Sequence, residues 1–132
     1  MTGKSAGVRP FSMRLHDGGY MHVEWHEGHT VTEQDARNLI GHLAGLSPSA
    51  HPPMLVHLNN MISLSRPALH AFATELQVSA LAIVGPTAVD RAITAFFTQV
   101  HEPHYPTQYF EKTDAAVQWL VNSLGVSGPS GG

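Results

Sequence analysis

The stretch PMLVHLNNMISLSRPALHAFATEL, residues 53–76, joins an apolar run, a polar turn and a helical pattern. Residues 53–58 are too few and too apolar for a surface helix, so they predict a buried strand. After the turn, Ser65 can cap a helix, and apolar side chains recur at helical spacing from Leu69 to Leu76. This stretch therefore predicts one strand–helix unit of an α/β protein.

Two further strand–helix units follow toward the C-terminus. Residues 78–84 are apolar on both faces, as expected of a central parallel strand covered by helices. Residues 87–100 carry the clearest helical pattern, opened by Thr87 as a capping residue. Residues 107–111 predict a short strand, and residues 113–124 predict the last helix.

Toward the N-terminus the pattern is that of a hairpin and one helix. Apolar and polar side chains alternate over residues 11–16 and 21–26, on either side of an Asp-Gly-Gly turn. Residues 32–45 then show helical spacing. The order ββαβαβαβα predicts an α/β fold: a mostly parallel mixed sheet of about five strands with four helices, in which the hairpin supplies an antiparallel edge strand.

The chain is expected to form one domain with two short ends. Residues 1–9 predict a flexible leader, residues 10–124 the domain, and residues 125–132 a flexible tail. Neither a linker nor an internal repeat interrupts the central segment, and its length suits a single hydrophobic core.

The composition disfavours or excludes several classes of function and of functional site. The chain of 132 residues has a formal net charge of −3 and scattered Lys and Arg residues, which disfavours nucleic acid binding. Its lack of cysteine excludes disulfides, thiolate nucleophiles and cysteine zinc sites. With neither a membrane span nor a signal peptide in the sequence, a cytoplasmic protein is expected. The sequence predicts no cofactor.

The segment HLNNMISLSRPAL, residues 57–69, resembles the stretch that carries the phosphorylatable serine in STAS domains, the SpoIIAA-like anti-sigma-factor antagonists of bacteria. The element order over residues 11–124 matches that family as well. Residues 92–120, AITAFFTQVHEPHYPTQYFEKTDAAVQWL, are similar to an uncharacterised bacterial STAS-like subgroup. The resemblance implies a regulatory domain that binds another protein.

The segment departs from the family pattern at its functional positions. That pattern is Asp-Leu-Ser, an apolar stretch, and then Asp-Ser-Ser-Gly at the start of a helix. Here the two acidic positions fall on His57 and Ser65, and the two serines fall on Arg66 and Pro67. Neither Arg66 nor Pro67 can accept a phosphate, so the resemblance predicts that the usual phosphoserine is missing.

The pattern His-Glu-X-His occurs twice, as HEGH at 26–29 and HEPH at 101–104. The first follows a strand and the second precedes one, which places them at opposite edges of the sheet, roughly 15 Å apart at about 3.3 Å per residue. Zinc–nitrogen bonds are about 2.0–2.1 Å long, so one ion cannot take ligands from both. An alternative metal site at the first edge consists of His26, Glu27, His29 and His57.

Polar residues follow the carboxyl ends of the predicted strands, where open α/β sheets bind their ligands. We predict no catalytic residues there and expect instead a surface for a partner or ligand, with Arg66 as the anchor for an acidic group. Exposed aromatic side chains are expected to line the contact, and the domain is expected to form a homodimer. The predicted partner-binding residues are His57, Asn59, Ser63, Ser65, Arg66 and Thr87, and the aromatic candidates are Trp25, Phe97, Tyr105 and Tyr109. The alternative function is a small-ligand-binding protein or metal-dependent enzyme with its site at this edge.

Overall fold

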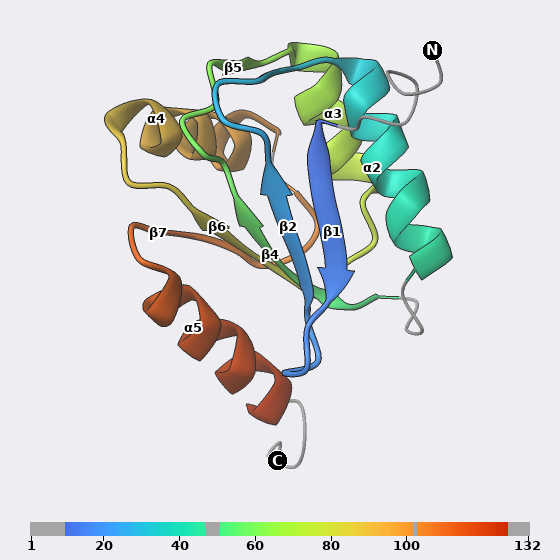
Figure 1. Cartoon of the computed structure of the whole chain (residues 1–132), viewed down its shortest axis with the longest axis vertical. Coiled ribbons are helices and arrows are strands. Elements are labelled where there is room, and N and C mark those ends of the chain that lie inside the picture. Colours follow the sequence, from blue (N-terminus) through green and yellow to red (C-terminus); the bar gives the residue numbers. More distant parts are fainter. Residues whose placement is uncertain (1–9, 47–50, 102, 127–132) are drawn as a thin grey trace, which may run out of the picture.

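The computed structural model describes residues 10–46, 51–101 and 103–126 (Figure 1). Five strands form the main sheet in the order β1-β2-β4-β6-β7. The first is antiparallel to the second, and the other pairs are parallel. The strands are β1 (Phe11–Leu15), β2 (Met21–Trp25), β4 (Pro53–His57), β6 (Ala80–Val84) and β7 (Thr107–Phe110).

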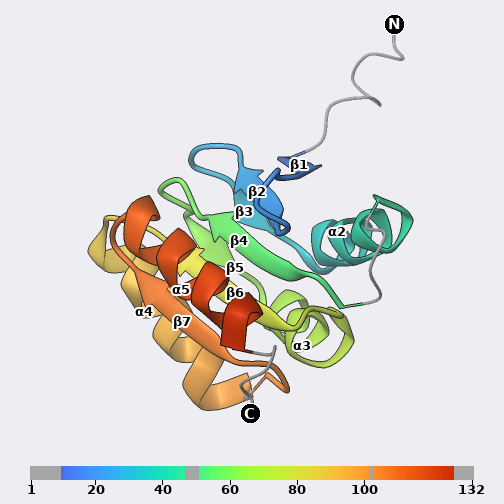
Figure 2. The same cartoon turned by 90° about the horizontal axis from the view of Figure 1, so that it is seen from below.

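Four α-helices are present in the described ranges: α2 (Glu33–Leu46), α3 (Arg66–Glu75), α4 (Ala88–Phe96) and α5 (Thr113–Val126). A π-helical turn, η1 (Phe97–His101), continues α4. Helices α2 and α3 pack on one side of the sheet and α5 on the other (Figure 2). The predicted α/β fold with a mostly parallel mixed sheet is therefore confirmed.

The core has two parts because successive side chains of a strand point to opposite faces. On one face, Val23, Met54 and Val56 pack with side chains of α2 and α3 such as Leu39 and Leu69. On the other face, residues of β4 and β6 pack against α5. Burial on both faces explains why β4 and β6 are apolar at nearly every position.

Two strands of only two residues were not predicted. Strands β3 (Thr30–Val31) and β5 (Ser63–Leu64) pair in parallel and form a separate small sheet. Segments this short have too few residues to show a hydrophobic period. The consequence is that the segment after β2 is tied to the segment after β4.

The helix starts follow the predicted caps. In α4 the Thr87 hydroxyl accepts from the Asp90 amide at 3.1 Å, and the Asp90 side chain accepts from the Thr87 amide, which completes a capping box. Thr32 and Asp35 form the same reciprocal pair at α2. The Ser65 hydroxyl accepts from the Ala68 amide at 3.2 Å and caps α3.

The expectation of exposed aromatic side chains was wrong for three residues. Trp25, Phe97 and Tyr105 are buried, while Tyr109 is partly buried. The turn from α4 into η1 leaves Phe96 as the exposed member of the Phe-Phe pair, and Tyr105 donates a hydrogen bond from its hydroxyl to the Phe72 carbonyl. These rings stabilise the core and are not available to a partner.

The last helix is longer at its C-terminal end than the sequence predicts. Helix α5 runs to Val126, two residues beyond the expected end at 124. The expected leader, residues 1–9, and residues 127–132 of the expected tail lie outside the described residues. Within the described ranges, no helix combines the length and the apolar character needed to cross a membrane.

Candidate functional site

Strands β2, β4 and β6 end at the same edge of the sheet, at Trp25, His57 and Val84. In Figure 1 this carboxyl edge is at the top, where the loop after β4 leads through β5 into α3. The predicted partner-binding residues follow these strand ends, so the topology brings them to this edge as expected from a parallel sheet.

The loop between β4 and α3 is held by the segment after β2. The Asn59 side-chain amide donates to the Trp25 carbonyl at 2.7 Å, and the Gly28 amide donates to the Asn59 carbonyl at 3.2 Å. Farther along, the Ile62 amide donates to the His29 carbonyl at 3.0 Å. These hydrogen bonds hold the loop against the segment that follows β2.

The loop also contains two consecutive residues in the left-handed region, Asn59 with φ 53° and Asn60 with φ 57°. Asparagine tolerates this conformation better than other non-glycine residues. The Asn-Asn pair therefore allows a sharp turn, after which Met61 is buried and Ile62 is exposed. Ile62 is the most exposed of the large apolar side chains described, at 64%.

The polar residues predicted to bind a partner fall into two groups. The Ser65 and Thr87 side chains cap helices, so their hydroxyls have a structural role. Ser63 and Arg66 are exposed beside Ile62. Among the described residues, no carboxylate pairs with Arg66, whereas Arg37 pairs with Glu33 and Glu75.

His57 belongs to a different face from the residues predicted to share a metal with it. Its register partner is Glu24, so its side chain points to the α5 face of the sheet. Trp25 points to the opposite face, and the His29 ring stacks on Trp25 with centroids 6.0 Å apart. The His29 ring nitrogen also hydrogen-bonds the Asp35 carboxylate at 3.0 Å. The structure therefore does not bring His29 and His57 together.

His57 lies instead beside two residues of β2. The ring centroids of His22 and His57 are 5.0 Å apart, and His22 Nε2 is 3.8 Å from the Glu24 carboxylate. One ligand atom from each of His22, Glu24 and His57 lies within 4.8 Å of the others. The alternation of β2 predicts that His22 and Glu24 share a face, but only the pairing of β2 with β4 adds His57 to them.

The environment of the two imidazoles disfavours their charged form. Burial lowers the pKa of His22 below 6.5, and the neighbouring His57 and Arg14 act in the same direction. Burial also lowers the pKa of His57, partly offset by the Glu24 carboxylate. The lowered pKa values favour the neutral form of both rings, the form in which imidazole is a ligand.

The two His-Glu-X-His segments stay apart, as topology predicted for them. His104 is exposed and precedes β7 at the amino edge of the sheet, whereas His26 and Glu27 are exposed at the carboxyl edge. His101 ends η1, and Glu102 lies outside the described residues.

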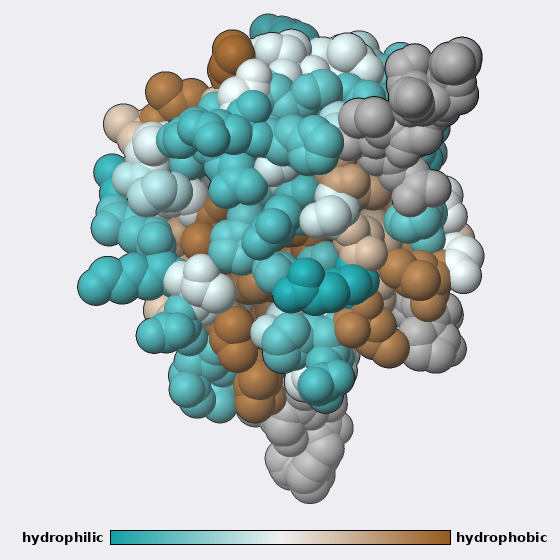
Figure 3. Space-filling view, in the orientation of Figure 1, coloured by the Kyte–Doolittle hydropathy of each residue, from teal (hydrophilic) through white to brown (hydrophobic). Residues whose placement is uncertain are grey.

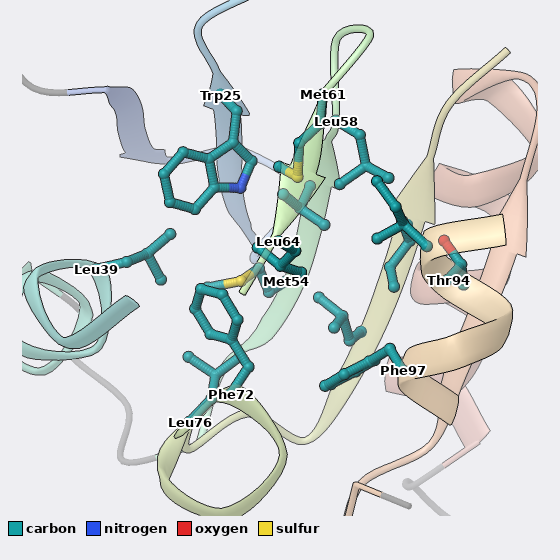
Figure 4. A pocket seen from close by; sticks show the side chains of 14 residues that line it. Trp25, Leu39, Met54, Leu58, Met61, Leu64, Phe72, Leu76, Thr94 and Phe97 are labelled. Atoms are coloured by element: carbon teal, nitrogen blue, oxygen red, sulfur yellow. The ribbon is translucent and has the colours of Figure 1, made fainter. Parts of the chain in front are cut away.

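An apolar cavity of about 50 Å³ lies between the sheet and helices α3 and α4 (Figure 4). Its walls include Trp25, Met61 and Phe97, and they are almost entirely apolar. The Thr94 hydroxyl at its wall already donates to the Asp90 carbonyl. The cavity thus offers little to orient a ligand, and we regard it as a packing space in the core.

Comparison with protein families and solved structures agrees with this fold. A family model described as "Domain of unknown function (DUF7793)" matches residues 13–124. An uncharacterised protein of the DUF3478 family from Shewanella loihica PV-4, described as having a SpoIIAA-like fold, is 16% identical with a TM-score of 0.59, covering 86% of this chain and 96% of that one. A protein of unknown function from Arthrobacter sp. FB24 is 28% identical with a TM-score of 0.34, covering 83% of this chain and 97% of that one. No curated protein matches the sequence. The SpoIIAA-like fold expected from residues 57–69 and from the element order is thereby confirmed.

Proposed function

This chain belongs to the family described as "Domain of unknown function (DUF7793)", and we propose that it is a non-catalytic SpoIIAA-like domain that regulates by binding another protein at the carboxyl edge of its sheet. The contact surface consists of Asn60, Ile62, Ser63, Arg66 and Val89, which we call the edge surface. The proposal keeps the bacterial setting that the sequence resemblance implies, together with the expectation of a cytoplasmic protein.

The observation that carries the proposal is the exposure of Ile62 on a fixed loop. Leaving an isoleucine side chain 64% exposed forgoes burial worth about 1–2 kcal/mol, yet the loop backbone is held by hydrogen bonds to His29 and Trp25. Val89, at the start of α4, is 51% exposed at the same edge. A fixed apolar side chain of this kind is suited to fill a pocket on a partner at little cost in entropy.

The charge of the edge surface indicates the chemistry of the partner. Arg66 is exposed and forms no ion pair in the described ranges, unlike Arg37 and Arg91, which pair with glutamates. A guanidinium in this position favours a carboxylate from the partner. We therefore expect an acidic segment with an apolar side chain that covers Ile62.

In this proposal, partner binding is not regulated by phosphorylation of a serine, as it usually is in the family that the sequence resembles. The positions that the family resemblance assigns to the two serines are Arg66 and Pro67, which have no hydroxyl. Ser63 is exposed in β5 and Ser65 caps α3. The interaction is therefore constitutive in the proposal, with affinity set by the edge surface itself.

The test is a comparative pull-down with matched variants. The immobilised domain is offered a lysate as wild type, as Ile62→Asp, as Arg66→Glu and as Val121→Asp, and the bound proteins are quantified by mass spectrometry. Val121 is 43% exposed on α5 and provides a control with the same change in charge. The proposal requires a protein that is retained by the wild type and Val121→Asp but lost by both edge variants.

Self-association is measured separately, because the sequence also predicts a homodimer. If the partner is a second copy of the chain, sedimentation of the wild type shows a dimer and Ile62→Asp shows a monomer. If the wild type is monomeric at every concentration, the homodimer is ruled out and a different protein must fill the role.

A further inference from the structure

The His22 side chain is unusual because both of its ring nitrogens are buried without a hydrogen-bond partner among the described residues. The side chain is only 12% exposed. A buried polar group without a partner costs about 1–3 kcal/mol relative to one that is hydrogen-bonded. An unsatisfied imidazole therefore requires an explanation, and the proposed edge surface gives none, because His22 lies on the sheet face rather than at that edge.

The neighbours of His22 supply the explanation. Glu24 is two residues along the same strand, and His57 is the register partner of Glu24 on β4, so all three side chains point to the same face. Their ligand atoms lie within 4.8 Å of one another. The two strands are hydrogen-bonded in a parallel pair, which fixes the three backbone positions relative to one another.

We propose that His22, Glu24 and His57 form a binding site for a divalent transition-metal ion, with zinc as its representative. Two imidazoles and one carboxylate are a donor set that zinc accepts, with an open position for water. In a tetrahedral zinc site with bonds of about 2.0–2.2 Å the ligand atoms are roughly 3.3 Å apart. The 3.8 Å between His22 Nε2 and the Glu24 carboxylate is close to that separation, and the three ligand atoms lie within 4.8 Å of one another, so metal binding requires them to move closer together.

The donor set selects the class of metal. Calcium and magnesium prefer oxygen ligands, and two of the three donors here are imidazole nitrogens. Helix α5 packs mainly on β6, β4 and β7, so it covers little of β2, the strand that carries His22 and Glu24. Figure 3 shows hydrophilic side chains beside β2, and the Glu24 side chain is 47% exposed.

Three neighbouring residues, His16, Tyr20 and Arg14, surround the site but are not proposed as ligands. The His16 ring stacks on Tyr20 with centroids 4.5 Å apart, and its Nδ1 accepts a hydrogen bond from the Gly18 amide. This bond leaves the proton of neutral His16 on Nε2, so that nitrogen is a donor and not a ligand. Arg14 adds a positive charge that opposes protonation of His22.

The low pKa values of the two histidines are consistent with this site but do not define it. Burial lowers the pKa of both His22 and His57.

The test is titration of the full chain, freed of metal by chelator, with zinc chloride in a calorimeter. The wild type should bind one zinc ion per chain. Replacing a ligand should weaken binding by about 100-fold or more for His22→Asn and His57→Asn, and by at least about 10-fold for Glu24→Gln. His26→Asn and His104→Asn are matched controls in exposed loops and should bind as the wild type does.

A second measurement needs no substitution and so does not depend on whether the variants fold. Proton–nitrogen NMR of the wild-type imidazoles should show zinc-dependent shifts at His22 and His57, while His26 and His104 stay unchanged. Absence of zinc binding, or binding that survives all three ligand substitutions, or binding abolished by His26→Asn, would overturn the proposal. The edge surface is on different residues, so its variants should bind zinc normally, and failure of one proposal leaves the other standing.

Discussion

The Asn59 side-chain amide donates a hydrogen bond of 2.7 Å to the carbonyl of Trp25, across 34 positions of the sequence. This bond joins the loop after β4 to the end of β2. Because the same loop presents Ile62 and leads to Arg66, the shape of the edge surface depends on a contact made beneath it. Stability and partner binding are therefore connected at this point.

Asn59 should stabilise the protein through two separate contributions, its side-chain hydrogen bond and its tolerance of the left-handed backbone conformation. Asn59→Gly loses the side-chain bond, at about 1 kcal/mol, but keeps the left-handed backbone. Asn59→Ala loses the bond and also strains the backbone, for a total of about 2–3 kcal/mol. Urea unfolding measures both. Asn60→Gly is the control, because Asn60 has the same backbone conformation without that bond, and its unfolding midpoint should stay close to that of the wild type.

Gly85 should not tolerate a side chain. A Cβ atom there would lie 2.4–2.6 Å from the buried side chain of Asp90, which completes the capping box of α4. We expect Gly85→Ala to lower the free energy of unfolding by about 1–3 kcal/mol through overpacking. Gly41→Ala in α2 meets no atom within 4 Å and should stabilise by up to about 1 kcal/mol. Equal effects at the two glycines would contradict this account.

The contribution of Asp35 to stability should depend on pH. Burial alone would raise the pKa of Asp35, but the hydrogen bonds from His29 and Thr32 together lower it below 3.8. A depressed carboxyl pKa in the folded state stabilises the protein above the unfolded-state pKa, and this contribution is lost as pH falls through the folded-state pKa. The difference in stability between the wild type and Asp35→Asn should therefore be full at about pH 5 and shrink toward pH 3. Thermal melts across this range measure it, and a constant difference would show that ionised Asp35 is not stabilising.

The hydroxyl of Tyr105 should contribute to stability and not to binding. It donates to the carbonyl of Phe72 at 2.7 Å, in the last turn of α3, where carbonyl groups lack helical partners. Tyr105→Phe should cost about 1–2 kcal/mol in urea unfolding, because it leaves that carbonyl without its donor. Any protein captured by the wild type should still bind this variant, since the ring is buried. Loss of capture with unchanged stability would point to a direct contact.

Much of the fold could be predicted, because the hydrophobic periodicity of a strand or helix and the capping residues of a helix are properties of short stretches of sequence. The alternation in β2 placed Met21 and Val23 in the core, and Thr87 with Asp90 marked the start of α4. The pairing of β3 with β5 could not be predicted, because each strand has two residues. Val89 belongs to the apolar pattern of residues 87–100 but is 51% exposed in the first turn of α4.

The candidate sites could likewise be predicted only in part. The carboxyl edge could be predicted from strand order, and it gathers Ser63 and Arg66 as expected. His57 was grouped with His26, Glu27 and His29 only because all four follow strands that end at the same edge of the sheet. That grouping did not consider on which face of the sheet each side chain lies. Sheet pairing instead places His57 beside His22 and Glu24. Contacts of this kind, between residues far apart in the sequence, cannot be recognised from the spacing of residues along the chain.

The central claim is that the edge surface around Ile62 binds another protein, and its most direct test is the affinity of that protein for matched variants. With the captured partner purified, the dissociation constant is measured for the wild type, Ile62→Asp, Arg66→Glu and Val121→Asp. We predict at least about 10-fold weaker binding for each edge variant, wild-type affinity for Val121→Asp, and weaker binding of the wild type as salt rises. Equal affinity across all four proteins, or a loss confined to Val121→Asp, would contradict the claim.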